Sequence, residues 1–204
     1  MKNRKKILIP IIIIALIIFI IILFFYYKSN KNGNTMINKS EEEIIDYILN
    51  IKSYEATLNI TVETNKNETQ YIVDQKLDNG IARQEVIEPN NIAGVITEYD
   101  GENLKIRNNK LDLETTFQNY QYIVKNRLWL DSFIEEYKNG ENKVTSNIEK
   151  NEIVLEVKTN EKQYNVYKKL YIDKNTGKPT KMIVEDVNQR TLVYILYTEI
   201  TISI

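Results

Sequence analysis

The chain has 204 residues, with 27 basic and 28 acidic side chains and a formal net charge of −1. It contains neither cysteine nor histidine, which excludes disulfides, Ser–His–Asp and Cys–His catalysis, zinc sites of the usual nitrogen or sulfur type, and lipid attachment through an N-terminal cysteine. Lysine and glutamate are interspersed without the clustered basic residues that nucleic acid rewards, so we expect no nucleic-acid partner.

A long apolar segment follows a short head with four basic residues. Residues 7–27 are uncharged, and as a helix rising about 1.5 Å per residue they cover the ~30 Å hydrocarbon core of a bilayer. The segment closes on two Phe and two Tyr, which suit the membrane–water interface, where a signal peptide would show small residues for cleavage. We therefore predict a retained anchor in residues 1–28, at the cell membrane, with a cytoplasmic N-terminus and the rest of the chain outside the cytoplasm.

The remaining residues divide into a spacer and one domain. Residues 29–39 are polar and predict a flexible linker, and residues 40–204 are long enough for a single domain with a core. Five of the 27 basic residues lie in or beside the anchor, which leaves 22 against 28 acidic ones and a net charge of −6 for residues 29–204.

Ser40 predicts the start of a helix, because Glu43 follows three residues later as a capping box requires. Residues 54–63 then alternate apolar and polar side chains, which predicts a strand with one buried face. Gly94 falls inside a later predicted strand and indicates a bulge or a bend. Further strands are predicted at residues 71–77, 81–87, 92–99, 104–106, 152–158, 164–172, 180–186 and 191–204.

A helical segment interrupts the strands between residues 128 and 140. Its apolar residues have helical spacing, Asp131 can cap its start, and Asn139 and Gly140 supply its end. The order of elements predicts an α+β fold, with one strongly curved antiparallel sheet and helices over its concave face.

The last predicted strand ends the chain on apolar residues. It should pair inside the sheet, while an uncovered apolar edge would let a second copy pair by strand exchange. The residues of this strand that are expected to point inward are Leu192, Tyr194, Leu196, Thr198, Ile200, Ile202 and Ile204.

Without histidine and cysteine, only carboxylate chemistry, lysine chemistry or an oxygen-ligated metal could remain, and each group of acidic residues has a structural explanation. Glu41, Glu42 and Glu43 suit a helix N-terminus, and Glu135 and Glu136 suit the solvated face of a helix.

Two further acidic features also have structural explanations. Glu185 and Asp186 are adjacent in a strand, so they point to opposite faces and cannot act on one substrate. Residues 173–177 resemble the start of a calcium loop, but the twelfth position holds a valine, which favours an Asx-type turn. We predict no catalytic residue, metal or cofactor.

Aromatic residues are numerous and concentrate around the central helical segment. They either line a cavity for an acyl chain or cover the sheet as an ordinary core, and the sequence leaves both alternatives open. The candidates for cavity or lid lining are Phe117, Tyr120, Tyr122, Trp129, Phe133 and Tyr137.

Three stretches of the domain carry a family resemblance: EVIEPNNIAGVITEYDGENLKI at residues 85–106, WLDSFIEEYKNG at 129–140 and LYIDKNTGKPTKMIVED at 170–186. Through them, residues 40–204 resemble the LolA-like exported proteins and, within these, the group of the clostridial germination lipoprotein GerS. The resemblance implies a half-open β-barrel with helices over its mouth and no catalytic residues. The missing lipid-attachment cysteine departs from the lipoprotein pattern, and the anchor would supply the tether instead.

The resemblance also implies two functional hypotheses. GerS-like proteins support a cortex-modifying N-acetylmuramoyl-alanine amidase in spore-forming bacteria, which implies a membrane-anchored, non-enzymatic binding protein of the cell envelope. Carriers of the LolA type shield acyl chains, which implies a lipid or lipoprotein carrier. A permanent tether suits the first role better than a shuttle. A third alternative, a carboxylate-based wall hydrolase, would need two acids converging in a cleft.

Overall fold

The structure, a computed structural model, describes residues 36, 38–64, 66–120, 128–158 and 167–203. Contacts within the chain define one unit from Met1 to Thr35 and a second from Met36 to Ile204, and the description below concerns the second. The predicted anchor lies outside the described residues, as does most of the predicted linker. Among the helices in the described ranges, none is long and apolar enough to cross a membrane.

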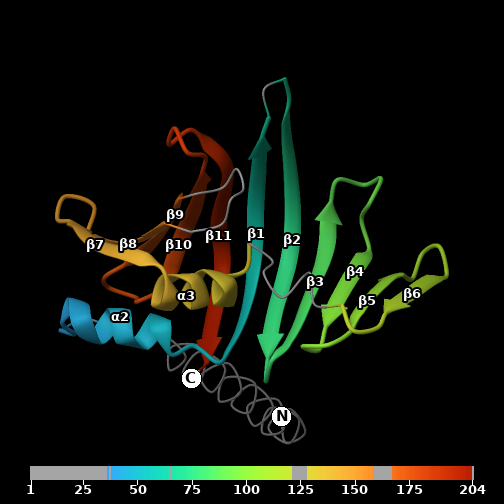
Figure 1. Cartoon of the computed structure of the whole chain (residues 1–204), viewed down its shortest axis with the longest axis horizontal. Coiled ribbons are helices and arrows are strands. Elements are labelled where there is room, and N and C mark those ends of the chain that lie inside the picture. Colours follow the sequence, from blue (N-terminus) through green and yellow to red (C-terminus); the bar gives the residue numbers. More distant parts are fainter. Residues whose placement is uncertain (1–35, 37, 65, 121–127, 159–166, 204) are drawn as a thin grey trace, which may run out of the picture. The chain divides into compact units, whose positions relative to one another are not determined.

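The described strands form one antiparallel sheet in the order β6-β5-β4-β3-β2-β1-β11-β10-β9-β8-β7 (Figure 1). Strands β6 and β7 are the two edges and do not pair with each other. The predicted antiparallel sheet is confirmed, and it is open and not closed into a barrel. The strand bounds are β1 (Ser53–Glu63), β2 (Glu68–Asp78), β3 (Ile81–Glu88), β4 (Val95–Tyr99), β5 (Leu104–Asn108), β6 (Leu113–Phe117), β7 (Glu141–Asn147), β8 (Glu152–Lys158), β9 (Tyr167–Asp173), β10 (Pro179–Glu185) and β11 (Thr191–Ser203).

Two chain-order meanders meet in the middle of this sheet. Strand β1 pairs with β2 on one side and with β11 on the other, both antiparallel. Strand β11 also pairs with β10, so the last strand has neighbours on both sides, as predicted. Because the final strand is central, the open edges belong to β6 and β7 and not to β11.

Two helices lie on one face of the sheet, over the half that contains β7 to β11 (Figure 1). Helix α2 (Glu41–Leu49) begins at the predicted capping box: the Glu43 backbone N–H donates to Ser40 Oγ, and the Glu43 side chain accepts from the Ser40 backbone N–H. Helix α3 (Leu130–Asn139) follows the central segment and contacts β7 and β8. Its cap residue is Trp129, which makes no side-chain cap bond, so the prediction that Asp131 caps the helix is wrong.

The core fills the space between these helices and the sheet. Strand β1 points Tyr54, Leu58 and Ile60 into it, as its alternation predicts. Burial at about 1.5–3 kcal/mol per large apolar side chain makes this cluster the main source of stability. Other fully buried side chains come from α2, α3 and strands β8 to β11, and they include Ile48, Leu130, Phe133, Ile153, Leu155, Val157, Leu170, Ile172, Met182, Val184 and Ile195.

A β-bulge changes which face of β11 is buried. The register of β1 with β11 shifts between Thr57 and Leu58, so Ala56 pairs with Ile200 but Leu58 pairs with Tyr197. The extra residue reverses the alternation, so Ile200 is buried as predicted but the residues before the bulge are not. The predicted inward set is therefore wrong for Tyr194, Leu196 and Thr198, and the buried residues there are Val193, Ile195 and Tyr197. Leu192 and Ile202 pack partly buried against the core, and Ile204 lies outside the described residues.

Three further details differ from the prediction. Strands β6 and β7 were not predicted, because LETTF and ENKVTSN lack a clear apolar alternation. Strand β4 begins at Val95, after a turn in which Gly94 has a φ of +83° and donates its N–H to Val86 O. Gly94 therefore lies at a turn and not inside a strand, where its positive φ favours glycine.

Candidate binding pocket

A hollow of about 270 Å³ lies between the start of α3 and strands β2 to β5, on the helix-covered face of the sheet. Its volume is close to the lower limit of small-molecule sites, about 300 Å³. Its lining combines apolar side chains with hydroxyl and charged groups. The lining residues are Lys52, Leu77, Gly80, Ala82, Thr97, Tyr99, Leu104, Trp129, Asp131, Ser132 and Glu135.

The start of α3 gives the pocket its aromatic wall. Trp129 precedes the first turn in an extended conformation, and its side chain is 5% exposed. Its ring meets that of Tyr54 edge-on, with centroids 6.4 Å apart. Such aromatic pairs add about 0.5–1.5 kcal/mol beyond their buried area. The packing therefore fixes Trp129 between the core and the pocket.

A chain of buried hydrogen bonds runs from the helix start into the sheet. The Leu130 N–H donates to Tyr54 Oη over 3.4 Å, and Tyr54 Oη donates to Gln75 Oε1 over 3.2 Å. Gln75 Nε2 then donates to Gln84 Oε1 over 2.9 Å. Sequence reasoning did not identify these residues as a network. The available signal was a glutamine at an inward position of two neighbouring strands.

Two polar atoms near this network find no hydrogen-bond partner among the described residues: Asp131 Oδ1 and Tyr197 Oη. Burial raises the pKa of the Asp131 carboxyl, although backbone N–H groups at the helix start oppose the effect. Burial also raises the pKa of the Tyr54 and Tyr197 hydroxyls, and the nearby Asp131 charge adds to both shifts. The two tyrosines therefore stay protonated, and Tyr54 uses its single O–H in the bond to Gln75.

The structure separates the six aromatic residues selected from the sequence. Phe133 and Tyr137 stack in the core beneath α3, with centroids 6.0 Å apart, and Trp129 lines the pocket. Phe117 lies on the edge strand β6, 43% exposed, and contacts the half-buried Tyr120, with centroids 5.7 Å apart. Tyr122 lies outside the described residues. Of the five that are described, Trp129 alone lines this pocket.

Three of the acidic residues considered for catalysis are engaged in ion pairs, while Glu135 lines the pocket together with Asp131. Glu41 accepts from Lys174 Nζ at 2.6 Å and from Ser146 Oγ at 2.5 Å, and these bonds lower the pKa of its carboxyl. Glu136 pairs with the buried Lys168, and Glu185 pairs with Lys169.

The structure also describes the segment that resembles the start of a calcium loop. Asp173 accepts from the backbone N–H and the hydroxyl of Thr176, which confirms the predicted Asx-type turn. Among the described residues, no three Asp or Glu side chains converge on a metal-sized site.

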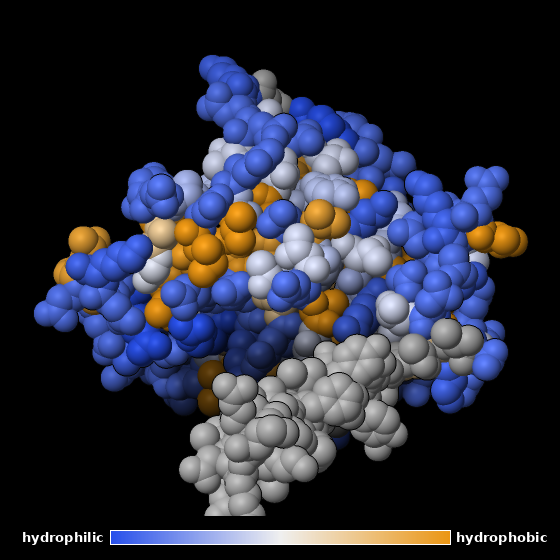
Figure 2. Space-filling view, turned by 180° about the vertical axis from the view of Figure 1, so that it is seen from behind, coloured by the Kyte–Doolittle hydropathy of each residue, from blue (hydrophilic) through white to orange (hydrophobic). Residues whose placement is uncertain are grey.

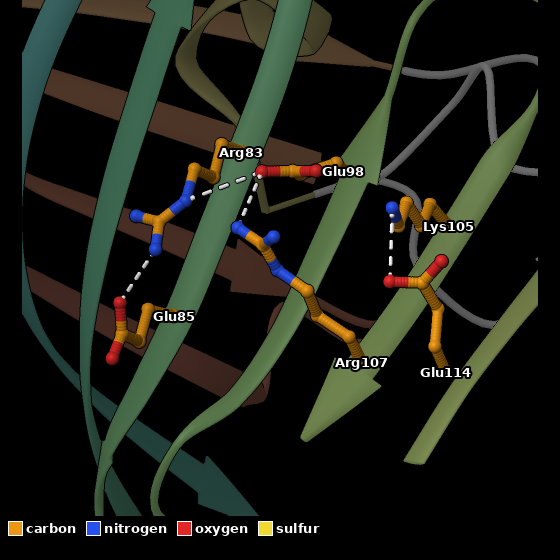
Figure 3. A network of polar contacts seen from close by, with 6 residues as sticks. All are labelled: Arg83, Glu85, Glu98, Lys105, Arg107 and Glu114. Carbon is orange, nitrogen blue, oxygen red and sulfur yellow. Dashed lines mark hydrogen bonds and ion pairs between the residues drawn. The ribbon is translucent and has the colours of Figure 1, made fainter. Parts of the chain in front are cut away.

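The opposite face of the sheet has a different character. In Figure 2, hydrophobic residues gather toward the middle of this face and hydrophilic ones surround them. Strand alternation places Ile87, which is 40% exposed, on this face, because it lies two residues along β3 from Glu85 of the ion pairs shown in Figure 3. Ile96 shares the face but is buried. An apolar patch within a charged border is typical of a protein-binding surface.

A ladder of ion pairs crosses β3 to β6 on that face (Figure 3). Glu98 Oε1 lies 3.5 Å from Arg83 Nε and 3.1 Å from Arg107 Nη2, and Arg83 Nη2 also lies 2.7 Å from Glu85 Oε2. The pair Lys105–Glu114 extends the ladder to the edge at 2.9 Å. The charges compensate one another, so this half of the sheet presents an ordered and nearly neutral polar surface.

Comparison with known proteins assigns the chain to a family. The model of a family described as "Sporulation protein YdcC-like" matches residues 5–204. The chain belongs to this family. Comparison with curated protein sequences gave no significant match.

Several solved structures are similar to this YdcC-like chain. A conserved protein from Thermus thermophilus is 12% identical, with 81% of this chain and 88% of its own covered and a TM-score of 0.52. A chain from the complex of the CwlD amidase with the GerS lipoprotein, from Clostridioides difficile, is 25% identical over 79% of this chain and 95% of its own, with a TM-score of 0.50. A LolA superfamily protein from Nitrosomonas europaea is 12% identical over 80% and 93%, with a TM-score of 0.41. The resemblance predicted from the sequence, including that to GerS, is confirmed.

Proposed function

We propose that this YdcC-like protein is a membrane-anchored, non-enzymatic binding protein that engages and supports a cell-wall amidase during sporulation. One observation carries the proposal: the likeness to a chain from the CwlD–GerS complex, which extends over 95% of that chain. Membership of a sporulation family gives the process in which to look for the partner.

The chemistry of the chain supports binding over turnover. The whole sequence has no histidine or cysteine, so hydrolysis would need carboxylate chemistry, lysine chemistry or an oxygen-ligated metal. The candidate acids Glu41, Glu136 and Glu185 are each held by a lysine, and only Glu135 among the described candidates lines the pocket, beside Asp131. The apolar patch and the charged ladder on the open half of the sheet supply the surface for a protein partner.

The anchor belongs to the same proposal. Residues 7–27 would hold the domain at the outer side of the cytoplasmic membrane, where a wall amidase acts. Protease treatment of intact cells tests this placement: the domain should be digested while a tag at the N-terminus stays protected. Digestion of both, or of neither, would contradict it.

Co-purification tests the binding role. The full chain, tagged and extracted in mild detergent from sporulating cells, should retain an N-acetylmuramoyl-alanine amidase. Ile87→Asp places a charge in the apolar patch and should reduce recovery, while Ile148→Asp, at a position 88% exposed on the other half, should not. Recovery of no amidase with the unaltered chain would refute the proposal.

Cell-wall chemistry provides an independent readout. Deletion of the gene should raise the fraction of cortex muramic acid that keeps its peptide, because an amidase removes that peptide. An unchanged muropeptide pattern would argue against amidase support.

A lipid carrier is the second candidate, and the pocket beside α3 favours it. Apolar side chains from Leu77, Leu104 and Trp129 could contact an acyl chain, and the hydroxyls of Thr97 and Tyr99 could meet a polar head. Native mass spectrometry of the full chain should then show bound lipid, and a substitution of Ala82 by phenylalanine, which fills the pocket, should remove it. Absence of lipid from the unaltered chain would eliminate this candidate and leave amidase binding untouched.

A further inference from the structure

The two edges of the sheet differ in how they are protected from pairing. Strand β7 carries Glu141 and Lys143, and Ser146 near its end bonds to Glu41 at the start of α2. Proteins usually protect edge strands with prolines, lysines, bulges or covering elements. Strand β6 has no proline or lysine, and among the described residues no strand pairs on its outer side.

Strand β6 is also apolar on one face. It presents Leu113 and Phe117, which are 61% and 43% exposed. Leu111, in the turn before β6, is 64% exposed and extends the apolar surface at this end. Within the part of the chain that the structure describes, this uncovered edge therefore lies beside exposed apolar side chains.

The sequence of β6 is self-complementary. Its register with β5 places Leu113, Thr115 and Phe117 on one face and Glu114 and Thr116 on the other. If two copies meet antiparallel about Thr115, Leu113 lies opposite Phe117 of the other copy on the apolar face. Glu114 lies opposite Thr116 on the polar face, so no like charges meet. Thr115 lies opposite its own copy, and a directly opposed Thr–Thr pair stabilises a sheet by about 0.2–1 kcal/mol.

The one charged group of β6 is already compensated. Glu114 Oε2 lies 2.9 Å from Lys105 Nζ of the neighbouring strand. Pairing at the edge therefore leaves no unpaired charge between the copies.

We propose that β6 is a homodimer interface, in which two copies join their sheets edge to edge, antiparallel and centred on Thr115. The occupant is a second copy because the strand complements itself at each position. This assembly does not depend on amidase binding, and it uses the edge of the sheet and not the pocket.

Disulfide trapping tests the interface in the full chain in membranes. The chain has no native cysteine, so a single Thr115→Cys substitution supplies the only thiol. Directly opposed residues of an antiparallel pair have Cβ atoms about 4.5–5.5 Å apart, near enough for a disulfide with small movement. Mild oxidation should give a covalent dimer. The matched control is Thr145→Cys, an exposed threonine on the other edge strand, which should give at least about tenfold less dimer.

A second substitution tests the register. Thr116→Glu, added to Thr115→Cys, places a carboxylate opposite Glu114 of the other copy in two symmetric pairs. Within one copy the new carboxylate pairs with Lys105, because Lys105 and Thr116 are register partners, so the fold is preserved. Dimer formation should fall on the order of tenfold. The proposal is overturned if Thr115→Cys and Thr145→Cys trap equally, if Thr115→Cys traps another protein instead, or if Thr116→Glu changes nothing.

Discussion

The two halves of the sheet use the same alternation of polar and apolar residues, but helices cover only one of them. In the open half, strands β3 to β6 bury only Ile96 and Leu104 among the described apolar residues, and they carry the ion-pair ladder on one face. Alternation alone therefore sets which residues share a face, and a covering helix decides whether that face becomes a core. In the covered half, strands β8 to β10 bury a set of inward side chains completely: Ile153, Leu155, Val157, Leu170, Ile172, Met182 and Val184.

The largest expected effect comes from the covered half. Phe133→Ala removes a fully buried ring from beneath α3 and should lower the free energy of unfolding by about 3–5 kcal/mol. Phe117→Ala, on the exposed edge strand, should cost less than about 1 kcal/mol. Chemical denaturation of both variants measures the difference. Equal losses would show that the open half is also buried in solution.

The stability lost on weakening an ion pair should also be larger in the covered half than in the open half. Glu136→Gln weakens the pairing of Lys168, whose side chain is 1% exposed, and should cost about 2–4 kcal/mol. Glu114→Gln weakens the pair with Lys105, where both side chains are at least a third exposed, and should cost about 0–1 kcal/mol. Denaturation at neutral pH compares the two. A loss below about 1 kcal/mol for Glu136→Gln would contradict the buried role of Lys168.

Asp131 should make the boundary between the halves sensitive to pH. Because burial raises the pKa of its carboxyl in the folded state, its contribution to stability is present below the unfolded pKa and is lost as pH rises through the folded one. The neighbouring Glu135 carboxylate also raises this pKa. Relative to wild type, Asp131→Asn should therefore be more stabilising at about pH 7 than at about pH 3.5. Thermal unfolding at the two pH values measures the difference, and a constant offset would exclude it.

A small effect that depends on salt is expected at the centre of the ladder. Glu98→Gln removes the acceptor shared by Arg83 and Arg107 and should cost about 0.5–1 kcal/mol at low salt. At about 1 M salt, where the Debye length is about 3 Å, the cost should shrink. The buried pair of Lys168 should respond less to salt, which makes salt titration a direct comparison of the halves.

Clear local patterns account for what the sequence predicted. The capping box at Ser40, the alternation of β1 and the Asx turn at Asp173 each depend on neighbours in the chain, and each was predicted. Strand β6 was not, because its register follows from pairing with β5 and not from its own residues. The bulge beside Thr57 likewise depends on contact between the two ends of the domain.

The candidate pocket was harder to predict for the same reason. Trp129 was selected for its aromatic character, but its partners come from β2 to β5, far away in sequence. Lys168, placed on an inward position of β9, appeared in the sequence as one more solvated lysine. Contacts between segments far apart in the sequence determine both the partners of Trp129 and the burial of Lys168.

The central place of β11 has a consequence for biogenesis. The other described strands are all synthesised before the one that joins the two meanders, so neither meander can complete its pairing at β1 or β10 until that last segment emerges. Late, non-local closure of this kind makes folding slow and leaves intermediates exposed. Nascent chains stalled before residue 191 should therefore depend on chaperones far more than completed ones.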